Sequence, residues 1–320
     1  MQGPVSKSLS GDATPASIVD ALKAVTGDPA EVRASFATSR WVRGTYAPSD
    51  QAKEITKSRS FTKPSRVLAR FSLGDSFLKA ADSCKRLLRG FSFRLGSDGQ
   101  RSEIFTQSAP VHFARTLDQM LAFLQARRPG PGGEPEAAKV AAFSAANPET
   151  LHQADYIATS SLPGSFAGTT YWGVHAFPAT NSQDETRFIK FKVTPVGGEV
   201  AHNEHAAEAT SADFLDHELE SRIAARDFRF SVMALLDRPG DPVMDVTIRW
   251  PDEDEREAVR LGTIVITGIE ANNATEEPVF NPANLADGFG HPPDEIFAAR
   301  RVAYAISQTR RRVWVGKRQL

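Results

Sequence analysis

The chain has 320 residues, 41% hydrophobic and 24% charged, and its 38 Lys and Arg residues nearly balance its 39 Asp and Glu residues. This composition suits one large globular domain or two small ones, and it gives no bulk electrostatic reason to expect binding to nucleic acid or an anionic membrane. The single cysteine, Cys84, excludes an internal disulfide framework and any site built from several thiolates, so a packing role is expected for it.

The sequence shows no targeting segment. No apolar run approaches the roughly 20 residues that span a bilayer. Residues 1–4 have neither a basic n-region nor an apolar h-region. A cytoplasmic location is therefore expected, or a periplasmic or secreted one if a leader has been removed. The expected partners are small molecules.

The first predicted element is a helix with Thr14 as N-cap and Pro15 at its first position. Its apolar residues recur at helical spacing, at Ile18, Leu22 and Val25. The sequence Gly-Asp-Pro at residues 27–29 ends it. We therefore divide the chain into an N-terminal helical arm, residues 1–27, and a main domain, residues 28–320.

Strands and helices then alternate in blocks. The first strands are predicted at residues 41–46, 67–72, 90–95 and 102–105. Helices follow at residues 117–125, at 136–144 and from 148. A second group of strands covers 171–177, 187–194, 228–236 and 261–269, with a helix at 212–225 inside it and a last helix from about 294. This order predicts an α+β fold whose core is a closed or nearly closed antiparallel barrel with inserted and C-terminal helices.

The last predicted helix carries Arg300 four residues before Tyr304. At this spacing the guanidinium and the phenol lie on one face of the helix. A fixed cation beside a tyrosine favours the phenolate, and a phenolate is one of the axial ligands of haem iron in proteins. The pair is also common on ordinary helices, so its meaning depends on the rest of the chain.

Several further segments precede this pair along the chain: Arg33, residues 70–72, 89–91, 110–115, 171–177 and 280–285, and Asp294. With these segments the chain resembles the catalase family, in particular its small single-domain branch, the catalase-related peroxidases. The resemblance extends from about residue 28 to residue 312. It implies a catalase-like antiparallel barrel, and the branch suggests a homodimer.

The resemblance implies a complete proximal haem site. Tyr304 would be the axial phenolate and metal ligand of haem b, with Arg300 favouring its ionisation. Asp294 and His175 would hold Arg300 in place through hydrogen bonds. Asp294 lies six positions before Arg300, so direct contact between them would need a bend. Considered alone, His175 is more often a packed core or surface histidine.

Three arginines match the positions that bind the haem propionates in the family: Arg33, Arg70 and Arg311. Each has a surface salt bridge as its alternative. Arg311 lies in a run of three arginines, where a slip of one residue would change its partner. Arg70 lies within an apolar strand, where an unpaired charge would be costly.

The distal side departs from the family. Phe36 occupies the position of the catalytic histidine, and Gln107 that of a second catalytic residue, an asparagine. Gln107 is expected to donate a hydrogen bond to an iron-bound oxygen ligand. Met120 matches a phenylalanine that packs on the haem face. Ser72, whose family counterpart bonds the distal histidine, has lost that partner. His112 could supply a base if it faced the pocket, but it is expected to point away, because the following phenylalanine would alternate with it along a strand.

A phenyl ring cannot carry out the general acid–base step, which contributes roughly 10²–10⁴-fold. The sequence therefore predicts a haem-dependent enzyme with weak or no catalase activity. It would use peroxide or an organic hydroperoxide to oxidise or rearrange a small organic substrate. The alternative is a non-catalytic haem-binding protein, a sensor or carrier on the same scaffold. A haem-free relative is a third possibility, which the intact proximal set disfavours.

Two other clusters of polar residues occur in the chain. Residues 202–205, His-Asn-Glu-His, with Glu208 lack the spacing of a zinc protease motif, and a solvated loop is the favoured interpretation. Residues 251–257 are rich in acidic side chains and are expected to form an exposed turn between strands.

Overall fold

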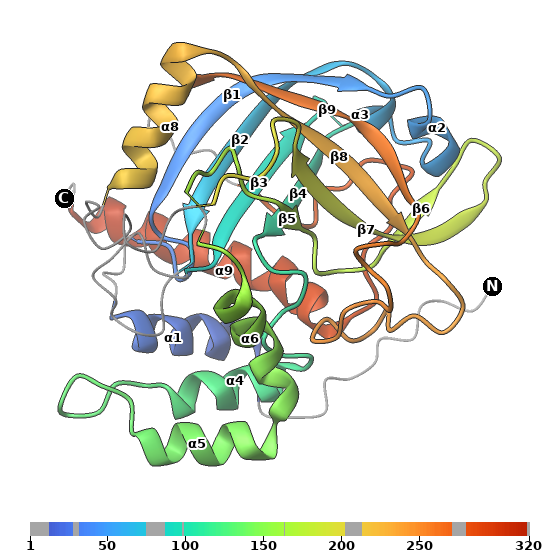
Figure 1. Cartoon of the computed structure of the whole chain (residues 1–320). Coiled ribbons are helices and arrows are strands. Elements are labelled where there is room, and N and C mark those ends of the chain that lie inside the picture. The colour runs from blue at the N-terminus through green and yellow to red at the C-terminus, as the bar shows by residue number, and fades with distance from the viewer. Residues whose placement is uncertain are drawn as a thin grey trace.

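A computed structural model describes residues 13–27, 32–74, 87–97, 99–162, 164–201, 213–270 and 280–318, with side chains up to residue 313. Its centre is an antiparallel β-barrel, with most of the helices gathered at one end (Figure 1). The strands are β1 (Ser39–Pro48), β2 (Ser65–Leu73), β3 (Arg89–Leu95), β4 (Ser102–Gln107), β5 (Tyr171–Trp172), β6 (Phe177–Thr180), β7 (Thr186–Pro195), β8 (Phe228–Leu236) and β9 (Ala258–Ile269).

The sheet closes on itself. Its strand order is β5-β4-β3-β2-β1-β9-β8-β7-β6, and β5 also pairs with β7. The short strand β5 makes the closure, since Trp172 pairs with Gln107 of β4 and with Lys192 of β7. Every pairing is antiparallel. The predicted fold class, an α+β chain with a closed antiparallel barrel, is confirmed.

The helices are α1 (Pro15–Thr26), α2 (Ala52–Ile55), α3 (Arg59–Thr62), α4 (Leu117–Ala126), α5 (Ala137–Ala146), α6 (His152–Thr159), α8 (Phe214–Ala225) and α9 (Glu295–Arg318), with a 3₁₀ turn at Pro148–Leu151. Helix α9 crosses one end of the barrel, and α1, α4 and α5 lie beyond it (Figure 1). Among the described helices, none is long and apolar enough to cross a membrane.

Helix α1 begins and ends as its sequence predicts. The Thr14 hydroxyl accepts a hydrogen bond from the Ser17 amide, and Gly27 closes the helix in the left-handed region at φ 67°. The helix packs against α4 and α9. The division into an arm, residues 1–27, and a main domain stays a prediction.

The strand predicted at residues 171–177 is wrong as one continuous element. The structure has the two-residue β5 and then β6, separated by residues 173–176. Gly173 lies close to the neighbouring strand, because a Cβ added to it would be 3.2 Å from Phe191 Cβ. The break allows the chain to leave the barrel wall and bring His175 to helix α9.

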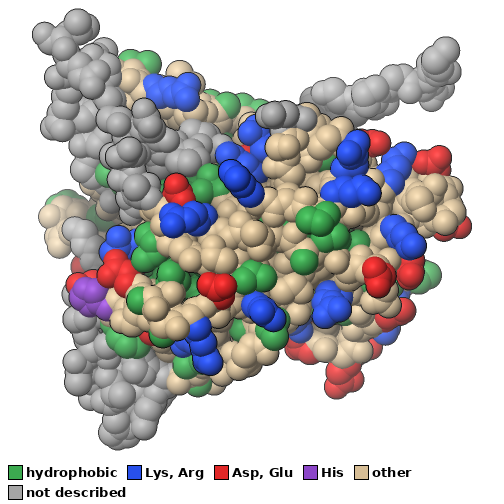
Figure 2. Space-filling view, turned by 90° about the horizontal axis from the view of Figure 1, so that it is seen from above, with side chains coloured by type: hydrophobic (Ala, Val, Ile, Leu, Met, Phe, Trp, Pro, Cys, Tyr) green, Lys and Arg blue, Asp and Glu red, His purple; other side chains and the backbone are tan. Residues whose placement is uncertain are grey.

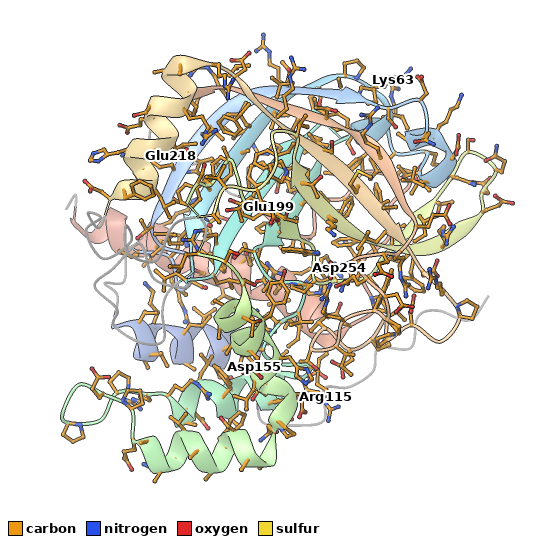
Figure 3. All side chains as sticks on the ribbon, viewed as in Figure 1. Lys63, Arg115, Asp155, Glu199, Glu218 and Asp254 are labelled. Atoms are coloured by element: carbon orange, nitrogen blue, oxygen red, sulfur yellow. The ribbon has the colours of Figure 1, made fainter. Side chains whose placement is uncertain are left out.

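Side chains fill the interior of the barrel (Figure 3). Phe71 and Phe91 stack there with ring centroids 4.7 Å apart, within a larger aromatic core. Because strand side chains alternate between faces, the neighbours Arg70, Ser72 and Gly90 face outward. A ligand site must therefore lie outside the barrel, against the outer face of these strands.

The surface at the end of the barrel away from α1, α4 and α5 is polar and mixed in charge. Figure 2 shows basic and acidic side chains interspersed across the face seen from above. This distribution agrees with the near balance of charges in the sequence, a formal net charge of -1.

Candidate haem site

A large cavity of about 1010 Å³ lies between the outer face of the barrel and the helices. Its barrel wall is formed by strands β1 to β4, where side chains stand in register. One row across the sheet joins Trp41, Arg70, Ser92 and Phe105. The next row joins Ser72, Gly90, Gln107 and Trp172. The other walls come from α1, α4, α5, α6 and α9.

A chain of hydrogen bonds ends at the phenol of Tyr304. Asp294 Oδ2 lies 2.9 Å from His175 Nδ1, and His175 Nε2 lies 2.9 Å from Arg300 Nη1. Arg300 Nη2 then donates to the Tyr304 hydroxyl at 3.4 Å. Asp294 therefore reaches Arg300 through His175, and no bend in the helix is needed.

The protonation of this chain follows from its donors. A guanidinium only donates, so His175 Nε2 must accept, and the proton of the neutral ring must be on Nδ1, facing Asp294. Burial lowers the pKa of His175, which keeps the ring neutral. Burial opposes ionisation of Asp294, yet His175, the Phe297 amide and Arg300 together lower the pKa of its carboxyl. The hydrogen-bonded series therefore consists of a negative Asp294, a neutral His175 and a positive Arg300.

Asp294 also sets the start of α9. Its Oδ1 accepts a hydrogen bond from the Phe297 amide at 2.8 Å, which is the bond of an N-cap residue. Asp294 is fully buried and His175 is 2% exposed. One carboxylate therefore fixes both the helix that carries Tyr304 and the histidine that orients Arg300.

All three arginines predicted to bind propionates line the cavity: Arg33, Arg70 and Arg311. Arg70 is 7% exposed and donates to the backbone oxygen of Phe36. Arg310 instead forms an ion pair with Asp20 of α1, 2.5 Å apart. The structure thus directs Arg311, rather than its neighbour, toward the cavity.

Phe36 lines the cavity with its backbone in the left-handed region, at φ 52°. This conformation is unusual for a bulky residue. Its ring lies against Gly90, where an added Cβ would be 3.2 Å from two ring carbons and 2.5 Å from the Ser72 hydroxyl. The phenyl ring therefore covers the outer face of β3 beside Ser72.

Gln107 and Met120 line the same cavity. Gln107 Nε2 donates to the backbone oxygens of Val111 at 2.8 Å and Ala109 at 3.3 Å. Both amide protons therefore serve the local backbone, and the side chain directs no free donor toward a ligand.

The expectation that His112 points away from the cavity is wrong. Residues 111–116 form no strand, so the alternation of faces does not apply to them. His112 and Phe113 both line the cavity, with their rings stacked at 4.3 Å. Burial lowers the pKa of His112 to about 3, although a bond from its Nδ1 to the Ala114 oxygen opposes this shift.

Sequence reasoning missed a cation in the cavity wall, Arg127, which follows the last turn of α4. The sequence contained a signal for this position, because the spacing i, i+3 and i+7 places Met120, Phe123 and Arg127 on one helix face.

The expected exposed turn at residues 251–257 needs correction at two positions, because Glu253 and Arg256 are buried. Glu253 is 2% exposed, and its Oε1 lies 2.6 Å from the buried Lys190 ammonium. Residues 202–205, Glu208 and Cys84 lie outside the described residues. Within the described part of the chain, no group of three metal-binding side chains was found.

Comparison with known proteins decides the family. The family model described as Catalase matches residues 18–319. The chain belongs to the catalase family. Membership implies a haem cofactor and an enzyme of the catalase and peroxidase kind.

Two relatives named catalase-related peroxidase are similar over nearly their whole length. That of Synechococcus elongatus is 29% identical, over 93% of this chain and 88% of the relative. That of Mycolicibacterium paratuberculosis is 26% identical, over 93% and 95%. A crystal structure of a fungal catalase superposes with a TM-score of 0.78 at 20% identity; the alignment covers 97% of this chain but only 65% of that catalase. The fold is therefore that of the catalases.

The residues present fit a haem. The cavity exceeds the upper end of common ligand pockets, about 1,000 Å³. The phenol of Tyr304, backed by a guanidinium, lies on α9, and three arginines line the cavity from the segment before β1 (Arg33), from β2 (Arg70) and from α9 itself (Arg311), as a dianionic cofactor requires.

Proposed function

We propose that this protein is a haem-dependent enzyme that prefers an organic hydroperoxide to hydrogen peroxide and has weak or no catalase activity. Haem b would bind with Tyr304 as axial ligand and with Arg33, Arg70 and Arg311 near its propionates. One contrast carries the proposal: the chain from Asp294 to Tyr304 is intact, whereas Phe36 stands where the family has a histidine.

When bound, the haem iron supplies the cleavage of the peroxide O–O bond. The protein's own residues set the conditions. Arg300 stabilises negative charge on the Tyr304 oxygen, and His175 with Asp294 keeps the guanidinium in position. Phe105 packs edge-on against Tyr304, with ring centroids 5.1 Å apart, and restricts the rotation of the phenol.

The distal wall is apolar and poor in groups that transfer protons. Phe36 and Met120 line it, and the Gln107 amide donates to the backbone oxygens of Ala109 and Val111. His112 with a pKa of about 3 is a weak base. Dismutation of hydrogen peroxide needs a group that takes a proton from one oxygen and returns it to the other. An apolar hydroperoxide, in contrast, gains from burial against these side chains.

Absorption spectroscopy tests the ligand assignment. The purified holoprotein should show the spectrum of a high-spin haem bound to a phenolate. Tyr304→Phe should abolish that spectrum. Tyr156→Phe is the matched control, because Tyr156 lies on α6 and does not line the cavity. A phenolate spectrum in Tyr304→Phe would refute the assignment.

Turnover tests the substrate preference. The rate with cumene hydroperoxide should be well above the rate with hydrogen peroxide at equal concentration. Equal and negligible rates with both would remove the enzymatic proposal and leave the second candidate, a non-catalytic haem-binding protein. The engaged amide of Gln107 favours that candidate, since its N–H groups already donate to the backbone and not to a bound ligand.

Phe36→His separates the two candidates further. Histidine tolerates the left-handed conformation of position 36 better than phenylalanine does. If the scaffold is catalytic, hydrogen peroxide turnover should rise by about 10²-fold or more, the range of general acid–base catalysis, at unchanged haem content. No gain at full haem occupancy would favour a carrier or sensor.

A further inference from the structure

Arg127 is a cation in the cavity wall with neutral partners. Its guanidinium carbon lies 3.5 Å from the centroid of the Phe123 ring and 5.8 Å from that of Phe143. Nη1 donates to the Phe123 backbone oxygen at 3.3 Å and Nη2 to the Ser144 hydroxyl at 3.4 Å. Among the residues the structure describes, no carboxylate forms an ion pair with it. This bond and the negative end of the α4 dipole stabilise part of the charge, and the rest is not neutralised by an ion pair with any described residue.

The environment of Arg127 is partly desolvated. Burial lowers the pKa of its guanidinium to about 10, and no charged neighbour contributes to the shift. Arg127 remains a cation at neutral pH. A partly buried cation is costly unless an anion compensates it. Glu134 also lines the cavity but is exposed, and it does not perturb Arg127.

The position of Arg127 relates it to the proposed reaction site. Met120, Phe123 and Arg127 all line the cavity from one face of α4. Seven residues at 1.5 Å per residue place Arg127 about 10 Å along the helix from Met120. Apolar side chains from neighbouring helices also line the cavity, with Val140 and Ala141 from α5 and Ile157 and Ala158 from α6.

We propose that Arg127 binds the carboxylate of an elongated organic acid whose apolar body lies in the cavity toward Met120 and Phe36. The guanidinium would fix one end of the molecule, and the apolar wall its length. This inference rests on the proposed function and adds to it the chemical class of the substrate: a carboxylic acid, or its hydroperoxide, with an apolar body. A simple peroxide would not use this subsite.

Binding of octanoate and octanol to the holoprotein, measured by calorimetry, tests the subsite. The two probes share an apolar chain and differ in the carboxylate. Arg127→Leu should weaken octanoate binding by about 10- to 100-fold, the range of a hydrogen bond to a charged group, and should leave octanol binding unchanged. Arg127→Lys should keep much of the affinity for octanoate. Arg128→Leu is the matched control, because Arg128 is exposed and does not line the cavity.

Three outcomes would overturn the inference. They are absence of octanoate binding to the wild-type holoprotein, equal octanoate affinity in wild type and Arg127→Leu, and loss of haem from Arg127→Leu, which would assign Arg127 to a propionate. Cumene hydroperoxide carries no carboxylate, so its turnover should survive Arg127→Leu. Failure of the wild type to turn over this compound would contradict the proposed enzyme and leave the carboxylate subsite standing.

Discussion

Asp294 performs two tasks with its two oxygens. Oδ1 accepts from the Phe297 amide at the start of α9, and Oδ2 faces the Nδ1 proton of His175. Substitution by asparagine separates these tasks, because asparagine keeps one acceptor for the cap but turns a donor toward His175. His175 would then move its proton to Nε2, where it opposes the Arg300 guanidinium.

Asp294→Asn should therefore disturb the haem site more than the fold. The absorption bands of the holoprotein should shift and haem retention should fall, whereas the urea midpoint of the apoprotein should change little. Asp294→Ala loses the cap as well and should cost a further ~1 kcal/mol of stability. An unchanged spectrum in Asp294→Asn would show that Arg300 is held without His175.

The burial of His112 should make the folded protein less stable in acid. Burial lowers the pKa of His112 to about 3 in the folded protein, whereas an unfolded histidine has a pKa near 6.5. Between these values the unfolded chain binds the proton and the folded chain does not, so stability is fully present above about pH 6.5 and declines as the pH falls toward 3.

Removing His112 should reduce this loss. The free energy of unfolding should fall in both proteins between pH 7.5 and pH 4.5. The loss should be smaller in His112→Phe than in wild type by on the order of 2 kcal/mol. This figure follows because one pKa unit is worth about 1.4 kcal/mol and cavity water screens part of the effect. Guanidinium titrations at both pH values measure this difference. His217→Phe on the surface of α8 is the control, and an identical acid response in wild type and His112→Phe would contradict the prediction.

At the scale of elements, Gly288 joins three segments of the barrel. Its φ is +98°, and its carbonyl accepts bonds from the Thr180 amide and the Thr56 hydroxyl. An added Cβ would lie 2.4 Å from the Ser58 amide nitrogen, a backbone atom that cannot move independently.

Gly288→Ala should therefore combine left-handed strain with a steric clash. Gly27→Ala is the matched control, since Gly27 has φ +67° and nothing within 4 Å of an added Cβ. We expect about 1 kcal/mol of destabilisation at Gly27 and clearly more at Gly288, measured by urea unfolding. Equal losses would mean that the segments around Gly288 relax freely.

Local sequence signals predicted the elements better than they predicted side-chain directions. The N-cap Thr14 and the left-handed Gly27 define α1 through neighbouring residues only, and this helix was predictable. The break after β5 was not predictable, because it depends on contact between Gly173 and Phe191, eighteen positions apart. The prediction for the direction of the His112 side chain failed for the same reason, because residues distant in sequence decide whether its segment joins the sheet.

The candidate site likewise has features that were predictable from the sequence and features that were not. The Arg300 to Tyr304 spacing places both side chains on one face of any helix, so this pair was accessible from the sequence. The hydrogen bonds of Gln107 to the backbone at Ala109 and Val111 depend on a local loop shape that no residue pattern specified. The phenylalanine at position 36 was visible in the sequence, whereas its left-handed backbone was not.

At the scale of the whole molecule, a buried ion pair joins the barrel to the loop after β8. Lys190 on β7 is 2% exposed, lies 2.6 Å from Glu253 Oε1, and donates to the Pro110 oxygen at 3.2 Å. Arg249 also bonds Glu253. Because Pro110 precedes the segment that carries His112, this pair supports one wall of the cavity from behind.

Breaking this pair on one side should be severe. Glu253→Gln leaves the Lys190 cation buried and should cost about 3–5 kcal/mol, whereas Lys190→Met with Glu253→Leu should recover a large part of that loss. Denaturant titration of the three proteins measures the difference. A double variant as unstable as the single one would assign the stability to the bonds with Pro110 and Arg249 instead.

The cavity makes the global stability depend on its occupant. It separates the barrel from α1, α4, α5 and α6, so ligand contacts would join the two parts of the molecule across about 1010 Å³. A ligand that binds only the folded chain adds about 4 kcal/mol when its free concentration is a thousand times its Kd. Reconstitution with haem should therefore raise the Tm by several degrees, since each kcal/mol shifts the Tm of a chain of 320 residues by about 1.5 °C. Tyr304→Phe should reduce the gain but not abolish it, because Arg33, Arg70 and Arg311 would still face the propionates. An equal gain in wild type and Tyr304→Phe would mean that the phenol contributes nothing to haem affinity, and no gain in either would contradict the placement of haem in this cavity.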